Sequence, residues 1–410
     1  MPNRGKFIGN DNLYVPDAPT IGTATAGNTQ VSVAFTAPSD VGNDAITAYG
    51  VSATDGTNVI GATGSSSPVT VTGLTNGTSY TAQAWAINDY GNGPLSAATD
   101  SFTPVLSICL HLGGLISAGG QSAGNIVDTF NLDSQGNATD FGDLSGNRCL
   151  LSSASSSTRA VVFGGGTTTS SGDVVDIMEY FTFASAGNAT DFGNLTAAKN
   201  KGAGFGNDTK GLYAGGRNSG AVRVQNIDAI TIASTGNATD FGDISGWSGN
   251  KTDYISGLAS PTRGIMAGQP NTIHYVTFAS AGNSTDFGDM TVDRYIMSEA
   301  CSSNTRGMFA GGILADFSGR SNVIDFITIA STGNATDFGD LSAGKREGAS
   351  TSSRTKGSYM GGETSSTQGD GLNEIEFWTI ATTGNATDFG DLQNATEEGT
   401  ACSSTHGGLA

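Results

Sequence analysis

The chain has 410 residues and a formal net charge of −19 at pH 7, yet only 13% of its residues are charged. Its few Lys and Arg residues are scattered, so the clustered positive charge that binds phosphate backbones is missing and a nucleic-acid partner is not expected. No run of about 18 apolar residues occurs, which argues against membrane insertion. With 61 Gly, abundant Ser and Thr, and no long amphipathic helical pattern, the composition predicts an all-β protein.

Residues 1–15, MPNRGKFIGNDNLYV, are predicted to be an N-terminal arm. They lack the apolar stretch of a secretory signal, so export by that route is not expected. Arg4, Lys6 and Phe7 give the arm charged and aromatic groups with which it can be anchored to a partner protein.

Residues 16–104 form a separate predicted domain with short alternating apolar and polar runs bounded by Pro, Gly and Asn, a pattern typical of a β-sandwich. The runs include VSVAFTAPSD, ITAYGVSA and LTNGTSYTAQAWAIND, with Pro19 at the start and Phe35 at a position often held by Trp. This stretch resembles a fibronectin type III domain. The resemblance implies that Tyr80 is the tyrosine-corner residue, whose hydroxyl bonds to backbone upstream.

Residues 105–410 contain six copies of one nine-residue phrase, GNATDFGDL or a close variant. The asparagines of the phrase stand at 137, 188, 237, 283, 334 and 385, so the period is close to fifty residues. This period is typical of one small β-unit repeated along the chain. The phrase itself predicts a turn at Gly-Asn, in which Asn bonds its own backbone, followed by a Phe wedge and a second Gly that allows close approach.

Between copies of the phrase, each repeat shows a strand that ends in paired glycines, a loop, and an apolar strand such as VIDFITIAST. This order resembles the kelch repeat, with Phe where kelch blades favour Trp. The resemblance implies a C-terminal β-propeller over residues 105–410, with six blades or, as an alternative, seven. In the six-blade interpretation, residues 397–404 supply the innermost strand of the blade that begins near residue 112, because closed propellers avoid free edges.

Motifs for catalysis or cofactors are weak, so the sequence predicts no enzyme, no cofactor and no metal site. Only three His are present, and none lies in a nucleophile, zinc or acid–base motif. The four Cys lack paired metal or redox spacings and are expected to be buried, reduced thiols. Oxygen ligation of Ca²⁺ by the repeated Asn, Thr and Asp remains an alternative to turn chemistry, although the spacing matches no calcium loop.

The loops after the second and fourth strands of each repeat should share one face of the propeller, and their sequences differ from repeat to repeat. Binding residues usually lie on loops that a rigid scaffold holds in place. The candidate receptor-binding residues on this variable face are Arg217, Trp247, Asp316, Phe317, Arg320, Gln368 and Asp370.

A fibronectin type III module followed by Gly/Ser/Thr-rich GNATDFGD repeats resembles virion structural proteins of tailed bacteriophages, including cyanophages. The resemblance implies a non-enzymatic tail fibre or capsid decoration located in the virion in multiple copies. The arm and the first domain would contact other virion proteins, and the propeller would attach to a host-surface glycan or protein. The alternative is a glycan-binding lectin or glycan-active enzyme on the same propeller, which a converging pair of carboxylates would favour.

Overall fold

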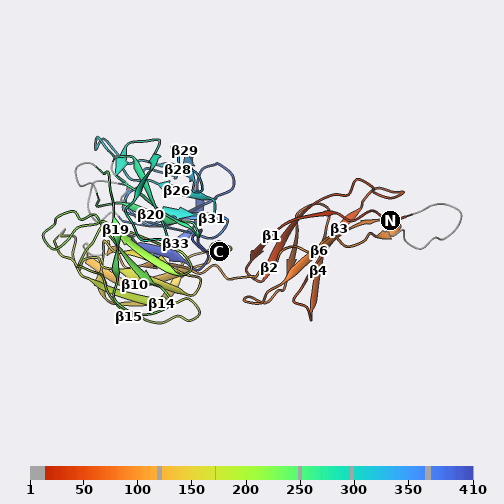
Figure 1. Cartoon of the computed structure of the whole chain (residues 1–410), viewed down its shortest axis with the longest axis horizontal. Coiled ribbons are helices and arrows are strands. Elements are labelled where there is room, and N and C mark those ends of the chain that lie inside the picture. Colours follow the sequence, from red (N-terminus) through yellow and green to blue (C-terminus); the bar gives the residue numbers. More distant parts are fainter. Residues whose placement is uncertain are drawn as a thin grey trace. The chain divides into compact units, whose positions relative to one another are not determined.

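The computed structural model describes residues 14–117, 122–170, 172–247, 252–268, 270–295, 300–364 and 371–409 (Figure 1). Strands and turns make up the described residues, which contain no helix, as the composition predicted. In this described part, accordingly, no helix has the length and apolarity needed to cross a bilayer. The chain divides into two compact units, Met1–Ser107 and Ile108–Ala410. The arm, with Arg4, Lys6 and Phe7, lies almost entirely outside the described residues.

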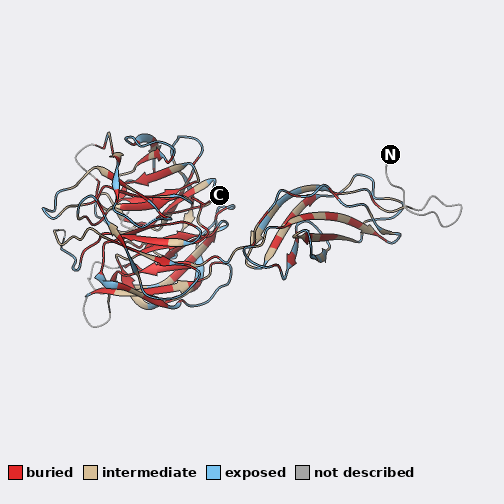
Figure 2. Cartoon of the chain, turned by 60° about the horizontal axis from the view of Figure 1, so that its bottom comes forward, coloured by how far each residue is buried: buried red, intermediate tan, exposed pale blue. Residues whose placement is uncertain are grey.

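The first unit is a sandwich of two antiparallel sheets. Alternate side chains of its strands are buried, so each sheet turns one face toward a shared core (Figure 2). One sheet has the order β1 (Thr20–Gly27), β2 (Gln30–Thr36), β5 (Val69–Thr72), and the other β4 (Val59–Gly64), β3 (Ala48–Thr54), β6 (Thr81–Asn88), β7 (Gly91–Asn92).

Tyr80 makes the predicted tyrosine corner. Its ring is buried, and its hydroxyl accepts a hydrogen bond of 3.1 Å from the backbone N–H of Thr75, five residues upstream. Phe35, at the position often held by Trp, is buried and packs on Tyr49 with ring centroids 4.9 Å apart. The sandwich core therefore keeps its geometry with a smaller aromatic residue.

The second unit contains six repeats, each of four antiparallel strands. The first five sheets follow chain order, and the sixth takes its first strand from the end of the chain. The sheets are β12 (Ser152–Ser155), β13 (Arg159–Phe163), β14 (Ile177–Thr182), β15 (Thr190–Asn194); β16 (Ala203–Gly206), β17 (Lys210–Ala214), β18 (Asn226–Thr231), β19 (Thr239–Asp243); β20 (Ser256–Ala259), β21 (Arg263–Ala267), β22 (Thr272–Thr277), β23 (Thr285–Asp289); β25 (Ala300–Ser302), β26 (Arg306–Ala310), β28 (Val323–Thr328), β29 (Thr336–Asp340); β30 (Ala349–Ser352), β31 (Lys356–Met360), β32 (Leu372–Thr379), β33 (Thr387–Glu397); and β34 (Thr400–Ser403), β8 (Cys109–Leu112), β10 (Ser122–Phe130), β11 (Thr139–Arg148).

Three short strands complete the unit. β9 (Leu115–Ile116) pairs with both β10 and β33. It therefore links the fifth sheet to the sixth by hydrogen bonds. β24 (Arg294–Tyr295) and β27 (Ile313–Leu314) pair with each other outside the main sheets.

The first strands consist largely of Ser, Ala, Gly and Thr, and nearly all of their residues are buried. Each first strand contacts the first strand of the next repeat, in the order β12, β16, β20, β25, β30 and β34. β34 in turn contacts β12, so the order of contacts is closed. Small side chains allow this approach, and a cavity of about 50 Å³ remains among them. Serine hydroxyls bond across from strand to strand, as from Ser302 to the carbonyl of Ala259 at 2.7 Å.

The chain ends are joined by strand pairing. β34 pairs with β8 in the register Thr400 to Leu112 and Ser403 to Cys109, as the sequence predicted for residues near 397–404. All four cysteines are free and buried, and Cys301 and Cys402 lie on equivalent first strands. Residues after β34 then run along the first strands, where the Gly407 N–H donates to the carbonyl of Ser302 at 2.8 Å.

The repeated phrase connects each repeat to the next one. The Asn side chain accepts a hydrogen bond from a backbone N–H in the preceding copy of the phrase, and the last copy receives the Asn of the first. The six bonds run from Asp143 to Asn188, Asn194 to Asn237, Asp243 to Asn283, Asp289 to Asn334, Asp340 to Asn385 and Asp391 to Asn137, at 3.0–3.2 Å. The sequence had predicted that each Asn bonds its own backbone, so this partner assignment was wrong.

The second Gly of the phrase is where the neighbouring turn touches the strand. A Cβ on Gly142 would lie 2.2 Å from the carbonyl oxygen of Gly187, and the other five copies meet the next turn within 2.4–2.6 Å. The φ of Gly142 is +152°, a conformation that favours glycine. The Phe between the two glycines is buried in every copy and packs on the following sheet, as Phe141 does on Phe181. The phrase is therefore architecture, as predicted.

Changing Gly142 to Ala should destabilise the second unit by about 2 kcal/mol or more, because the new Cβ collides with backbone that cannot rotate away. Urea unfolding of the full chain measures the effect. Gly146→Ala in the same strand is the matched control, since a Cβ there meets nothing within 4 Å. Equal stability of the two variants would contradict the role assigned to the second Gly.

Removing residues 400–410 should leave β8 without its partner strand, so we expect aggregation or loss of cooperative unfolding. Size-exclusion chromatography and thermal unfolding of the truncated chain measure both. A truncated chain that stays monomeric and melts at the original temperature would show that the terminal pairing contributes nothing.

Candidate functional site

Five residues occupy matching positions, each two residues before a first strand, and we call them the collar. All five have left-handed backbone with φ between +53° and +60°, although none is glycine. Their side chains differ while the strands around them repeat. The collar consists of Leu150, Lys201, Tyr254, Glu347 and Glu398; the sixth matching position, 298, lies outside the described residues.

Backbone hydrogen bonds join the collar residues directly to one another. The N–H of Leu150 donates to Glu398, that of Lys201 to Leu150, that of Tyr254 to Lys201 and that of Glu398 to Glu347, at 2.7–3.0 Å. A left-handed non-glycine residue costs about 1 kcal/mol or more, so these bonds hold a strained conformation in place. Four different polar side chains are thereby brought together where the repeats meet.

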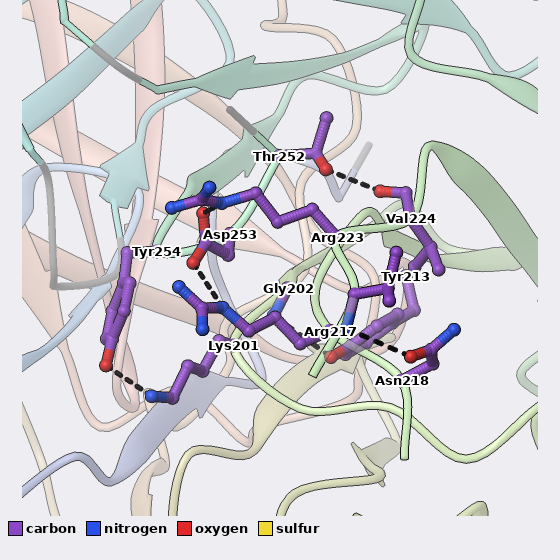
Figure 3. A network of polar contacts seen from close by, with 11 residues as sticks. Lys201, Gly202, Tyr213, Arg217, Asn218, Arg223, Val224, Thr252, Asp253 and Tyr254 are labelled. Carbon is purple, nitrogen blue, oxygen red and sulfur yellow. Dashed lines mark hydrogen bonds and ion pairs between the residues drawn. The ribbon is translucent and has the colours of Figure 1, made fainter. Parts of the chain in front are cut away.

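On one side of the collar, Lys201 and Tyr254 form a pair (Figure 3). The Lys201 ammonium bonds the Tyr254 hydroxyl and lies 4.4 Å from the centroid of its ring. Burial lowers the pKa of Lys201 and raises the pKa of Tyr254. Next to this pair, both Arg217 and Arg223 bond the carboxylate of Asp253, which is fully buried.

On the other side, carboxylates converge. Oxygens of Glu347, Glu363 and Glu397 lie within 4.8 Å of one another, and all three residues are buried. Such a group could hold a divalent cation. However, Glu363 is already bound by two guanidinium groups, Arg320 at 2.8 Å and Arg346. Because two guanidinium groups already bind the Glu363 carboxylate, we interpret the arrangement as an ion-pair network and not as a metal centre.

Glu398 differs from these carboxylates. Its Oε2 atom is buried and accepts no hydrogen bond from any described residue. Burial raises its pKa, and the neighbouring Glu347 and Glu397 raise it further against the opposing effect of Lys201 and Arg346, to about 8. The collar therefore contains a carboxyl group that keeps its proton at neutral pH.

A hairpin stands apart from the collar and presents Phe317. Its ring is 70% exposed and stacks on Tyr295, with centroids 5.2 Å apart and an interplanar angle of 27°. The φ of Phe317 is +58°, which is rare for a bulky residue. The Asp316 carboxylate accepts hydrogen bonds from the N–H and the hydroxyl of Ser318, and β24–β27 pairing holds the base of the hairpin. The exposed ring is thus held in a fixed position.

The predicted binding residues fall into different settings. Asp316 and Phe317 share the hairpin, and Arg320 closes it while pairing with Glu363. Arg217 is held by Asp253 near the collar. Gln368 and Asp370 lie outside the described residues.

Trp247 was predicted to be a surface binding residue, and the structure contradicts this. It is 6% exposed and belongs to a hydrophobic core cluster, where its ring meets His274 edge-on at 5.3 Å. The reason lies in the repeat. The third strand of each repeat buries one polar residue at a matching place, and in four repeats a basic residue from the segment before the repeat pairs with it, as Lys199 does with Asp228 at 2.8 Å. In the third repeat, Trp247 and His274 stand at the equivalent places.

Sequence reasoning missed the collar. Lys201, Tyr254, Glu347 and Glu398 lie in segments aligned as strand beginnings, and no motif marks them. A signal was available, because aligned repeats show four polar residues of three types, Lys, Tyr and Glu, two places before strands that are otherwise alike. Only the left-handed backbone and the closed order of contacts reveal that the side chains converge.

Comparison with known proteins identifies the first unit. Residues 17–102 match the family model of the fibronectin type III domain, and they are therefore a fibronectin type III domain, as the motifs of residues 16–104 indicated. No curated protein matches the chain significantly.

Stability should depend on pH through Glu398. The folded state keeps a proton up to about pH 8 that the unfolded state releases near the ordinary value of 4.5, so stability falls as pH rises between these values. Glu398→Gln removes this cost, and we expect it to raise the free energy of unfolding at pH 8 by on the order of 3 kcal/mol relative to its effect at pH 4.5. Urea unfolding across pH measures it. Parallel pH curves for the two proteins would contradict the raised pKa.

Proposed function

We propose that residues 108–409 form a six-bladed, kelch-like β-propeller. Three features support six blades: the closed order of contacts among first strands, the pairing of β34 with β8, and the six Asn bonds that return to Asn137. The seven-blade alternative assigned an extra blade to Val105–Leu110 and the C-terminal strands. Those strands instead share the sheet of β10 and β11.

We propose that this propeller is an attachment module, without enzymatic activity, that binds a host-surface glycan or protein. The Phe317 hairpin is the observation that carries the proposal. An exposed aromatic ring in strained backbone lowers stability, so its rigid presentation is better explained by a partner than by folding. Asp316 and Arg320 lie on the same hairpin and add charged groups to it.

The wider setting we propose is the virion of a tailed bacteriophage, in which the chain is a tail fibre or a capsid decoration present in several copies. The motif resemblance of the repeats supports this setting. In it, the arm and the fibronectin type III domain contact other virion proteins, and no cofactor is involved. Immunogold labelling of the particle with antibody to the fibronectin type III domain tests the location.

A lectin or glycan-active enzyme is the second candidate, because carboxylates do converge, at Glu347, Glu363 and Glu397. Of these two, a lectin fits better. Glu363 is bound by Arg320 and Arg346, which makes this one carboxylate a poor acid or base for glycosidic cleavage, a reaction that uses two carboxyl groups. Absence of new reducing ends after incubation with host polysaccharide would support binding without cleavage.

Replacing Phe317 with Ala should reduce attachment to host cells about tenfold or more, since aromatic anchors contribute about 2 kcal/mol to binding. Adsorption of labelled protein to cells measures the effect, and Phe317→Tyr should retain most of it. Leu95→Ala, which removes an exposed apolar side chain from the fibronectin type III domain, is the control. The melting temperature of Phe317→Ala should not fall. Undiminished adsorption of this variant would exclude the hairpin as the attachment site.

A further inference from the structure

A groove of about 470 Å³ lies between the fourth and fifth repeats, and its volume is in the range of pockets that hold small ligands. It is bordered by the β25–β26 turn, the β30–β31 turn and the residues directly after β32. The β25–β26 turn precedes β26, whereas the Phe317 hairpin follows it. The groove and the hairpin therefore lie at opposite ends of this strand.

Two guanidinium groups line the groove, one from each repeat. Arg306 donates from Nη1 to the carbonyls of Ile380 and Ala381 at 2.9 and 3.0 Å. Its Cζ atom also lies 4.8 Å from the centroid of the Phe326 ring. Arg354 is exposed at the middle of the β30–β31 turn. The described residues that line the groove include no Asp or Glu, and Arg306 belongs to no ion pair within the described chain.

Comparison with the other repeats separates the structural cation from the additional one. Arg306 has a basic counterpart in four other repeats, and each of these side chains donates to a backbone carbonyl of the following repeat. Arg306 thus joins two repeats with or without a ligand. Arg354 has no such counterpart, because the middle of the matching turn is neutral or acidic in the other four repeats that contain it. Those residues are Ser157, Asp208, Pro261 and Asn304.

We propose that this groove binds the acidic group of a negatively charged saccharide, with Arg306 and Arg354 as its cationic contacts. A guanidinium group presents five donors in a planar fork, which fits the oxygens of a carboxylate or a sulfate. The hydrogen bonds that Arg306 makes to described residues use Nη1 alone, so Nε and Nη2 remain as donors for a ligand.

The rest of the lining favours a sugar over a small inorganic anion. A groove of about 470 Å³ is many times larger than one water-sized ion. Asn304 and Thr355 are exposed at its border and supply an amide and a hydroxyl group, which can bond sugar hydroxyls. Two kinds of sugar offer the acidic group, a uronic acid with its carboxylate and a sulfated sugar with its sulfate ester. The groove goes beyond the attachment role of the Phe317 hairpin and does not depend on it.

Isothermal titration of the full chain with methyl β-glucuronide tests the site. Methyl β-glucoside is the neutral counterpart, and its 6-sulfate is the sulfated probe. We expect at least one acidic probe to bind at least tenfold more tightly than the neutral probe, at a single site per chain, because charge-assisted hydrogen bonds are the stronger ones. The tighter acidic probe identifies the kind of sugar. Equal binding of acidic and neutral probes, or no binding of either acidic probe, would overturn the proposal.

Arg354→Gln should weaken binding of the acidic probe about tenfold, and its melting temperature should not change because the side chain is exposed. Arg223→Gln is the matched control, since it removes the same charge from another loop, where Arg217 still pairs with Asp253. Its affinity should equal that of the unmodified chain. Unchanged affinity in Arg354→Gln, or the same loss in both variants, would contradict the site. The titration uses no cells, so its failure is distinguishable from a failure of host attachment.

Discussion

The second unit depends on one backbone contact that is made six times. The turn at the first Gly of each phrase lies against the second Gly of the preceding phrase, close enough that a Cβ would reach 2.2–2.6 Å. This approach brings the Asn side chain onto the neighbouring N–H and seats the Phe against the next sheet. Turn, hydrogen bond and wedge are thus set by the absence of a side chain at one position, and that position is Gly in every copy.

The polar interior follows the same repeat. The third strand of each repeat buries a polar residue that the segment before the first strand of the same repeat satisfies. Removing one partner of such a buried pair is far more costly than replacing both, so the pairs change together. Arg148 with Glu179 and Lys199 with Asp228 are ionic, whereas Trp247 with His274 is aromatic and Gln393 with Asp128 is an amide pair. The loops that carry these partners also carry the collar.

Local patterns were sufficient to predict much of the fold. The alternating runs, the tyrosine corner and the glycine turns depend on neighbours in sequence, and these were read correctly for the fibronectin type III domain and for the strands of the repeats. Exposure at loops was not predictable in the same way. Trp247 was predicted to be exposed because it lies in a loop, but its ring packs against His274, which lies on another strand and is distant in sequence. Phe317 lies in a similar loop, yet Asp316 and Tyr295 keep it outside.

The collar shows why convergence could not be derived from sequence. Glu398 and Glu347 are 51 residues apart, and only the contact order of the first strands makes them neighbours. Only 13% of the residues in the chain are charged. Bringing the charged side chains of Lys201, Glu347 and Glu398 together on left-handed backbone lowers the stability of the fold, because both the partial burial of charge and the backbone conformation are unfavourable. The rest of the repeat avoids such costs by using Ser, Thr and Gly. The cost is therefore confined to the place where the repeats differ.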